Sequence, residues 1–351
     1  MLPHVMHAGS SAHLALSCPQ SRAIPIGGVD WDQRPWVRYN KRMPESDELW
    51  DFYWEVRLQA LEDLGKREAI LAASKLTRIL AEAPGKSVRL LELGCGEGQV
   101  IGALVEAHAS VSGSCGVDYS HRAIEKSRSV YPGISFVEGD FTDPDLLHGL
   151  GPFEIILFVN ALHEVFSATY SPELGEVDVP QAKLRVEQAL AGASEILAPG
   201  GYLVLFDGLE SPGDLTEWVR IRFRHWQARR RFETFAREYH PFQITYRVIG
   251  DPFVVELPLR DFSRYIDKSI FLEKRLWQTE RLESYQYYTQ AEFTDVLARL
   301  RLEIRELRIL TVNYEKWQAE VEILTPGVDF PAEHILILAC KPGGLPRLDT
   351  A

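Results

Sequence analysis

The chain has 351 residues, 46% of them hydrophobic and 25% charged, which is the composition of an ordinary soluble globular protein. Its formal net charge of −12 argues against a nucleic-acid partner, because binding a phosphate backbone needs a basic face. No stretch approaches the roughly 18 apolar residues of a membrane span, and four scattered cysteines without a CxxC pair favour a reduced cytoplasmic protein with no metal site.

The N-terminal part is predicted to contain two segments. Residues 1–28 have neither a basic start nor a sustained apolar run, so we expect a flexible lead rather than a signal peptide. Residues 29–87 are predicted as a helical extension. Apolar residues recur there at three- and four-residue steps from 46 to 83, and the pattern stops at Pro84-Gly85.

Short apolar runs then alternate with helix-like segments up to residue 208. The predicted strands cover residues 88–94, 111–120, 134–141, 153–162 and 202–208. The predicted helices between them cover residues 98–109, 121–132 and 181–197. Strands and helices that alternate at this spacing indicate an α/β fold, a parallel sheet with helices on both faces.

Residues 209–285 interrupt this order and are rich in aromatic side chains. We predict an inserted cap, after which residues 286–343 return to the sheet domain with one helix and two strands. Within the cap, helical spacing predicts a helix with a buried apolar stripe, which consists of Trp218, Ile221, His225, Ala228, Phe232 and Phe235. Four arginines fall opposite this stripe and form either a solvated face or an anion site: Arg222, Arg229, Arg230 and Arg231.

A glycine-rich loop follows the first predicted strand in the segment LLELGCGEGQV, residues 90–100. Ligands of parallel sheets bind outside the carboxyl ends of the strands, and glycines there let a backbone turn sharply beneath a ligand. Gly94, Gly96 and Gly98 read G-x-G-x-G rather than the dinucleotide pattern G-x-G-x-x-G. The loop therefore predicts a nucleotide-type ligand other than a dinucleotide, with Glu92 inside the strand beside it.

Acidic residues end the next two predicted strands. Asp118, in GVDYS, is spaced from the glycine loop so that it can accept both hydroxyls of a ribose. Asp140, in EGDF, is followed by Phe141, and a carboxylate beside an aromatic ring suits the edge and face of a purine. Each acid alone is a common loop residue, but the three features in this order predict one nucleoside-binding edge.

At this point the chain resembles a known family, the class I S-adenosylmethionine-dependent methyltransferases. LLELGCGEG resembles the family's first motif, GVDYS its second, EGDF its third, FEIILFVNALHEV its fourth and LAPGGYLVLFDG its fifth strand. The resemblance implies a doubly wound, seven-stranded sheet, mostly parallel with an antiparallel last strand, formed by residues 88–208 and 286–343. The cap at 209–285 would then cover the site.

The resemblance also implies roles for individual residues. S-adenosylmethionine would be the cofactor, with its amino-acid part on Gly94, Gly96 and the backbone carbonyl of Asn160. Glu92 would orient the loop or reach the cofactor ammonium. The remaining contacts would be Asp118 with Tyr119 at the ribose, and Asp140 with Phe141 at the adenine.

Catalytic candidates follow the fourth strand and the cap. His163 and Glu164, in NALHEV, are placed at the mouth of the expected site. His163 is either a general base or a packed structural residue. Tyr285 and Tyr287, in ESYQYYT, are expected on one side of a strand-like segment, where aromatic faces suit a sulfonium cation.

Three functions stay open at this level. The first is methyl transfer to a small molecule of the secondary-metabolite type, yielding S-adenosylhomocysteine. The second is cleavage of the Cγ–S bond, either by cyclisation to azetidine-2-carboxylate with release of methylthioadenosine or by aminocarboxypropyl transfer. The third is a binding protein that keeps the cofactor site without turnover.

Overall fold

The computed structural model describes residues 64–82, 86–212, 217–311 and 313–343. The predicted lead and most of the predicted N-terminal extension lie outside these residues. The described part of the extension is helix α3 (Leu64–Leu80). None of the described helices is both long and apolar enough to cross a membrane.

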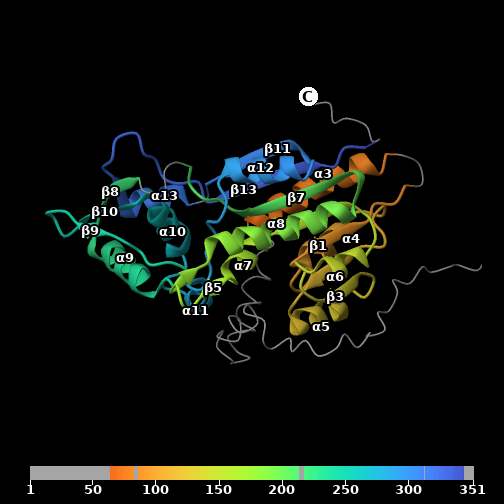
Figure 1. The fold of residues 1–351 in the computed structure, drawn as a ribbon, viewed down its shortest axis with the longest axis horizontal. Helices are drawn as coiled ribbons and strands as arrows, with labels where there is room; N and C mark the ends of the chain where they lie inside the picture. Colours follow the sequence, from red (N-terminus) through yellow and green to blue (C-terminus); the bar gives the residue numbers. More distant parts are fainter. Residues whose placement is uncertain (1–63, 83–85, 213–216, 312, 344–351) are drawn as a thin grey trace, which may run out of the picture. The chain divides into compact units, whose positions relative to one another are not determined.

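Seven strands form the main sheet in the order β11-β13-β7-β4-β1-β2-β3 (Figure 1). Their bounds are β1 Leu90–Leu93, β2 Cys115–Asp118, β3 Ser135–Glu138, β4 Phe153–Val159, β7 Leu197–Gly208, β11 Glu303–Leu310 and β13 His334–Cys340. The pairs β1-β2, β2-β3, β1-β4 and β4-β7 are parallel. Strand β13 runs antiparallel to both β7 and β11. The predicted fold, a mostly parallel seven-stranded sheet with an antiparallel last strand, is confirmed.

The sheet separates two hydrophobic cores because successive side chains of each strand point to opposite faces. In β1, for example, Leu90 belongs to one core and Leu91 to the other. One core includes residues of α3, α4 (Gln99–Ala107) and α5 (His121–Val130). The other includes residues of α6 (Pro144–His148), α7 (Leu162–Ser167), α8 (Val179–Ile196) and α12 (Gln290–Arg299). Helices therefore cover both faces, as the alternating pattern predicts.

A second, four-stranded sheet has the order β12-β8-β10-β9 and is antiparallel throughout (Figure 1). Its strands are β8 Trp218–Phe223, β9 Arg247–Val248, β10 Val254–Pro258 and β12 Val321–Ile323. Three helices accompany it: α9 (Trp226–Glu238), α10 (Leu259–Ser269) and α11 (Trp277–Glu280). Strand β12 comes from residues beyond 285, so this sheet extends past the predicted limits of the cap. The domain boundaries themselves remain a prediction.

The predicted helix through residues 218–235 is wrong in its first half. Trp218 and Ile221 lie on strand β8, whose side chains alternate between exposed and buried. The helix starts only at Trp226, with His225 as its N-cap and Ala228, Phe232 and Phe235 buried. The aromatic side chains of α9 and α10 pack on one another; Phe232, for instance, contacts Tyr265 edge to face at 5.1 Å.

The four arginines of this region do not form one basic face. Arg222 lies on β8 and pairs with Glu322. Arg229 is buried, with its guanidinium 5.6 Å from the centre of the Phe232 ring. Arg231 pairs with Glu320 on α13 (Tyr314–Glu320). Each of these three arginines thus has its own partner, and the alternative of an anion site is not supported. The remaining pair of short strands, β5 (Tyr170–Ser171) and β6 (Glu176–Val177), forms a separate hairpin.

Candidate functional site

A cleft lies at the carboxyl ends of β1, β2, β3 and β4, where the glycine-rich loop predicts a ligand site. Gly94, Gly96 and Gly98 all adopt positive φ angles, of 77°, 51° and 76°. Gly94 and Gly96 line the cleft. Gly98 packs elsewhere, because a Cβ there would lie 2.7 Å from the Phe136 ring. The alternating glycines therefore reflect three left-handed backbone positions, of which two face the cleft.

Two carboxylates hold this loop in place. Asp118 accepts hydrogen bonds of 2.8 Å from the backbone N–H groups of Gly96 and Ser120, one on each oxygen. Glu92 accepts a hydrogen bond of 3.0 Å from the N–H of Ile101 in the first turn of α4. Burial raises the pKa of Glu92 to about 8. Both side chains also line the cleft. Asp118 thus ties the loop to the end of β2, and Glu92 ties β1 to the start of α4.

The cleft continues into a second chamber beside β3. Its wall includes Asp140, Phe141 and Thr142, together with Arg185 from α8. Asp140 accepts hydrogen bonds from the N–H and hydroxyl of Thr142, at 2.8 and 2.7 Å. The Arg185 guanidinium lies 3.4 Å from the other Asp140 oxygen. Phe141 packs edge to face on Phe158, with ring centres 5.7 Å apart.

Four residues line both chambers and mark where the two join: Tyr119, Ala161, Glu164 and Glu283. Asn160, immediately before Ala161, lines the first chamber and has a positive φ of 52°. Ala161 also explains why residue 94 is glycine, since a Cβ at Gly94 would lie 2.6 Å from the Ala161 methyl group. Tight packing of the loop on the start of α7 thus forms the floor of the junction.

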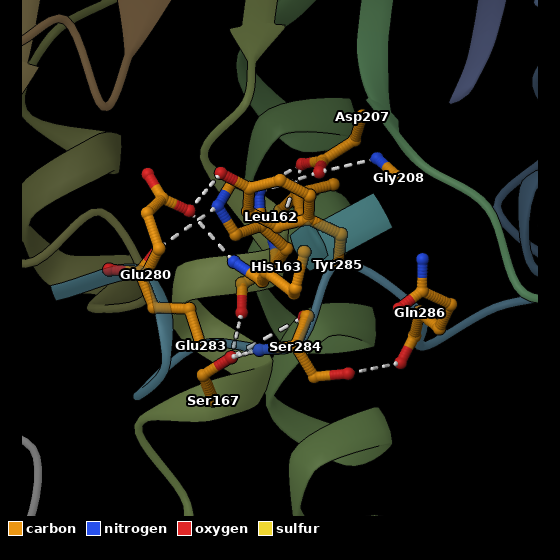
Figure 2. A network of polar contacts seen from close by, with 11 residues as sticks. Leu162, His163, Ser167, Asp207, Gly208, Glu280, Glu283, Ser284, Tyr285 and Gln286 are labelled. Atoms are coloured by element: carbon orange, nitrogen blue, oxygen red, sulfur yellow. Dashed lines mark hydrogen bonds and ion pairs between the residues drawn. The ribbon is translucent and has the colours of Figure 1, made fainter. Parts of the chain in front are cut away.

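His163 lies behind this junction rather than at its mouth, where the sequence places it. The residue is 1% exposed. Its Nδ1 lies 2.7 Å from Asp207 Oδ1, and its Nε2 lies 3.7 Å from Glu283 Oε2 (Figure 2). Asp207, at the end of β7, also accepts hydrogen bonds of 2.8 Å from the N–H groups of Leu162 and Gly208. Burial lowers the pKa of His163, but the charge and hydrogen bond of Asp207, with Glu283, outweigh it and raise the pKa to about 9.

Folding stability should therefore depend on the proton of His163. Because its pKa rises from 6.5 to about 9 on folding, its contribution is complete below pH 6.5 and is lost as the pH rises through 9. The shift corresponds to a free energy on the order of 3 kcal/mol. We expect the difference in unfolding free energy between wild type and His163→Gln, measured in urea, to shrink by about that amount between pH 6 and pH 10. A difference that stays constant over this range would contradict the raised pKa.

The two tyrosines predicted to share one side of a strand lie in different surroundings. Tyr285 packs edge to face on His163 at 4.4 Å and donates a hydrogen bond of 2.6 Å to Glu280 (Figure 2). Tyr287 packs on Phe166 at 5.8 Å and lines a different cavity. Residues 285–288 do not form a strand, so the expected strand alternation does not apply. Neither tyrosine lines the cleft.

Several residues that line the cleft were not predicted from the sequence. Lys66 comes from α3 and donates a 2.8 Å hydrogen bond to Gln99 across the first chamber. Glu97, inside the glycine loop, also lines that chamber. Glu283 is carried by the loop after α11 and reaches the junction from a segment far along the chain. Gln99 could have been predicted as a lining residue, because it starts α4 directly after the glycine loop. No local pattern in the sequence predicts Lys66 or Glu283.

Among the described residues, one group has spacing that suits a metal ion. The possible ligand atoms of His163, Glu164 and Glu283 all lie within 4.8 Å of one another. Asp207 Oδ1 lies 2.7 Å from His163 Nδ1, so the other ring nitrogen, Nε2, is the one that faces Glu283 Oε2, at 3.7 Å. With the raised pKa of His163, these contacts form an ion-pair cluster.

A family model described as a methyltransferase domain matches residues 65–245, more than half of the chain. A search of curated protein sequences found no match. Among solved structures, a SAM-dependent methyltransferase from Methanosarcina mazei is 13% identical, with coverage of 74% of this chain and 94% of that one and a TM-score of 0.39.

Two further solved structures are similar at the same level. A TehB-like SAM-dependent methyltransferase from Corynebacterium glutamicum is 15% identical, with coverage of 84% and 98% and a TM-score of 0.40. The N-methyltransferase NodS from Bradyrhizobium japonicum is 14% identical, with coverage of 80% and 98% and a TM-score of 0.37. On the family model and the seven-stranded sheet, the chain belongs to the class I S-adenosylmethionine-dependent methyltransferases, and S-adenosylmethionine is its cofactor.

Proposed function

We propose that the cleft binds S-adenosylmethionine with its amino-acid end in the first chamber and its adenine in the second. Glu92 and Lys66 both line the first chamber. The ammonium of the ligand would favour the ionised form of Glu92 against the effect of burial, and Lys66 would face the ligand carboxylate. Asp118, in the first chamber, and Tyr119, where the two chambers join, would hold the ribose. Asp140 and Phe141 would receive the adenine, with Arg185 fixing the Asp140 carboxylate.

The reacting sulfonium would then lie at the junction. We propose that the enzyme transfers its methyl group there to a small molecule, and that Glu164 accepts the proton from the acceptor's O–H or N–H group. The observation that carries this proposal is that Glu164 and Glu283 line both chambers. A carboxylate at this point would be within reach of both the sulfonium and its nucleophile, and positioning supplies most of the catalysis in such transfers.

His163 has a different role in this proposal from the one the sequence suggests. A side chain with a pKa of about 9 already holds its proton near neutral pH, so it is a poor base there. Its positive charge instead faces the Glu283 carboxylate, with Nε2 3.7 Å from Oε2, and would orient it. We therefore regard His163 as a positioning residue and Glu164 as the catalytic one.

Replacing the proposed base should affect turnover more than binding. We expect Glu164→Gln to lower kcat by about 100-fold or more, because general base catalysis contributes roughly 10²–10⁴. The Kd for S-adenosylhomocysteine, measured by calorimetry, should change less than about threefold because the amide keeps the shape of the side chain. Glu125→Gln, an exposed change on α5, is the matched control. Unchanged kcat in Glu164→Gln would show that another group takes the proton.

The reaction type is tested by following the fate of the cofactor. Purified protein is incubated with S-adenosylmethionine alone and with a small-metabolite extract, and products are separated by mass spectrometry. S-adenosylhomocysteine that forms only with the extract is the expected result. Methylthioadenosine released without any acceptor would instead show Cγ–S cleavage, and tight cofactor binding with neither product would show a protein without turnover.

A further inference from the structure

A second cavity, of about 320 Å³, lies on the other side of helix α7. Phe166 lines it, whereas the neighbouring α7 residues Val165 and Ser167 line the cofactor cleft. Within the described part of the chain, no residue lines both this cavity and the cleft. Exposed Glu176 and Gln243 lie among its lining residues and open it to solvent. Its volume is at the lower end of that of small-molecule sites, roughly 300–1,000 Å³.

One residue of the cavity wall, Gln286, has a buried side chain with unusual surroundings. The residue is 1% exposed, and both Oε1 and Nε2 are buried without a hydrogen-bond partner. Its side chain points away from the contact between His163 and Glu283 (Figure 2). Burying an amide without partners is costly, so native proteins nearly always satisfy such groups. The unpaired Nε2 donor and Oε1 acceptor of Gln286 are complementary to the edge of a ligand that offers one acceptor and one donor.

Arg264 adds a second unpaired donor. It is 5% exposed, and its Nη1 donates a 3.0 Å hydrogen bond to Asp261. Its Nε has no partner. The guanidinium carbon lies 3.6 Å from the centre of the Phe242 ring, and both residues line the cavity. The Arg264 Nε is therefore a candidate donor to an acceptor atom of a ligand.

Charges around the cavity are largely balanced. Lys183 pairs with Glu292 at 2.5 Å. Arg264 and Arg260 both pair with Asp261, at 3.0 and 3.9 Å, and Glu176 adds a further carboxylate at the exposed side. Burial raises the pKa of the Glu210 carboxyl above its ordinary value, which favours its neutral form. The apolar part of the wall includes the rings of Phe166, Phe242 and Tyr287, together with Val179. Aromatic walls with paired charges suit a neutral, flat molecule better than an ion.

We propose that this cavity is a second ligand site for a small, neutral, planar molecule with a carboxamide or lactam group. The amide edge would bond to both atoms of the Gln286 side chain, and the ring would lie among the aromatic residues. The site is distinct from the methyl-transfer cleft, because α7 separates the two. It does not depend on which reaction the cleft performs.

Benzamide is a suitable probe, and saturation-transfer NMR with the full chain saturated in S-adenosylhomocysteine measures its binding. We expect saturable binding that S-adenosylhomocysteine does not displace. N,N-dimethylbenzamide, which lacks the donor, should bind at least about tenfold more weakly, as expected for a lost hydrogen bond to a buried group. Benzoate, which is charged and also lacks the donor, should bind no better than N,N-dimethylbenzamide.

The variants Gln286→Leu and Gln286→Glu should each weaken benzamide binding by about tenfold, for the same reason. Gln290→Leu, at an exposed glutamine of α12, is the matched control and should change nothing. The affinity for S-adenosylhomocysteine reports whether each variant is folded. The proposal is overturned by absence of saturable benzamide binding, by displacement with S-adenosylhomocysteine, by preference for benzoate, or by equal binding to wild type and Gln286→Leu.

Discussion

Replacing Asp118 by Ala is expected to weaken binding of S-adenosylhomocysteine by about 100-fold, equivalent to about 2.7 kcal/mol. Each Asp118 oxygen already accepts one backbone hydrogen bond, from Gly96 or Ser120. A carboxylate oxygen offers more than one lone-pair site, so an oxygen that accepts a backbone bond can also accept one from a ribose hydroxyl. The Asp118→Ala substitution would remove both ribose contacts and release the glycine loop together, and hydrogen bonds to a charged group are worth roughly 1.5–3 kcal/mol each.

Calorimetric titration with S-adenosylhomocysteine measures this effect. Asp118→Asn keeps the shape and one acceptor oxygen, so its loss should be intermediate between wild type and Asp118→Ala. Asp145→Ala, on the short helix α6 after β3, removes an acid outside the residues that line the cleft and should leave affinity unchanged. Wild-type affinity in Asp118→Ala would mean that the cofactor does not use this strand end.

Replacing Lys268 by Met is expected to destabilise the protein by about 3–5 kcal/mol, the usual cost of leaving a buried charge without its partner. Lys268 is 0% exposed and Glu280 is 3% exposed, and their side chains pair at 2.8 Å. The ammonium also lies 3.5 Å above the Tyr285 ring, whose hydroxyl donates to the same Glu280 oxygen. Loss of the ammonium in Lys268→Met would leave the Glu280 carboxylate with the tyrosine hydroxyl alone.

Urea unfolding of both single variants and the double variant measures the coupling. Lys268→Met with Glu280→Leu removes both charges and should recover most of the loss, because an apolar pair of similar volume is often as stable as a buried ion pair. Lys274→Met, at an exposed lysine, should cost less than about 1 kcal/mol. An equal loss for Lys268→Met and Lys274→Met would mean that the buried pair contributes little.

The part of the cleft at the ends of β1, β2 and β3 was predictable because its sequence signals are local. The glycine loop, Asp118 and Asp140 each sit at the end of a short apolar run, and a parallel sheet brings such ends to one edge. Their placement follows from topology without knowledge of distant contacts. The particular reason for each glycine was not predictable, since Gly98 packs on Phe136 rather than facing a ligand.

The junction and the second sheet were harder to foresee. Glu283 meets His163 only because the loop after α11 packs on the end of β7, where the close approach of Tyr285 leaves no room for a Cβ at Gly208. The charge state of His163 likewise depends on Asp207, 44 positions away. Strand β8 could have been predicted from the sequence, because Val219, Ile221 and Phe223 alternate with exposed residues at the period of a strand. The helix was predicted instead because apolar residues of the same segment also fit helical spacing.

The most direct test of the proposed site is a crystal structure of the protein with S-adenosylhomocysteine. The account predicts adenine beside Asp140 and Phe141, ribose hydroxyls on Asp118, and the amino-acid group on the Gly94–Gly96 loop, with the sulfur at the junction beside Glu164. Density for the cofactor product in the cavity behind α7, or in the cleft with its two ends exchanged, would contradict it.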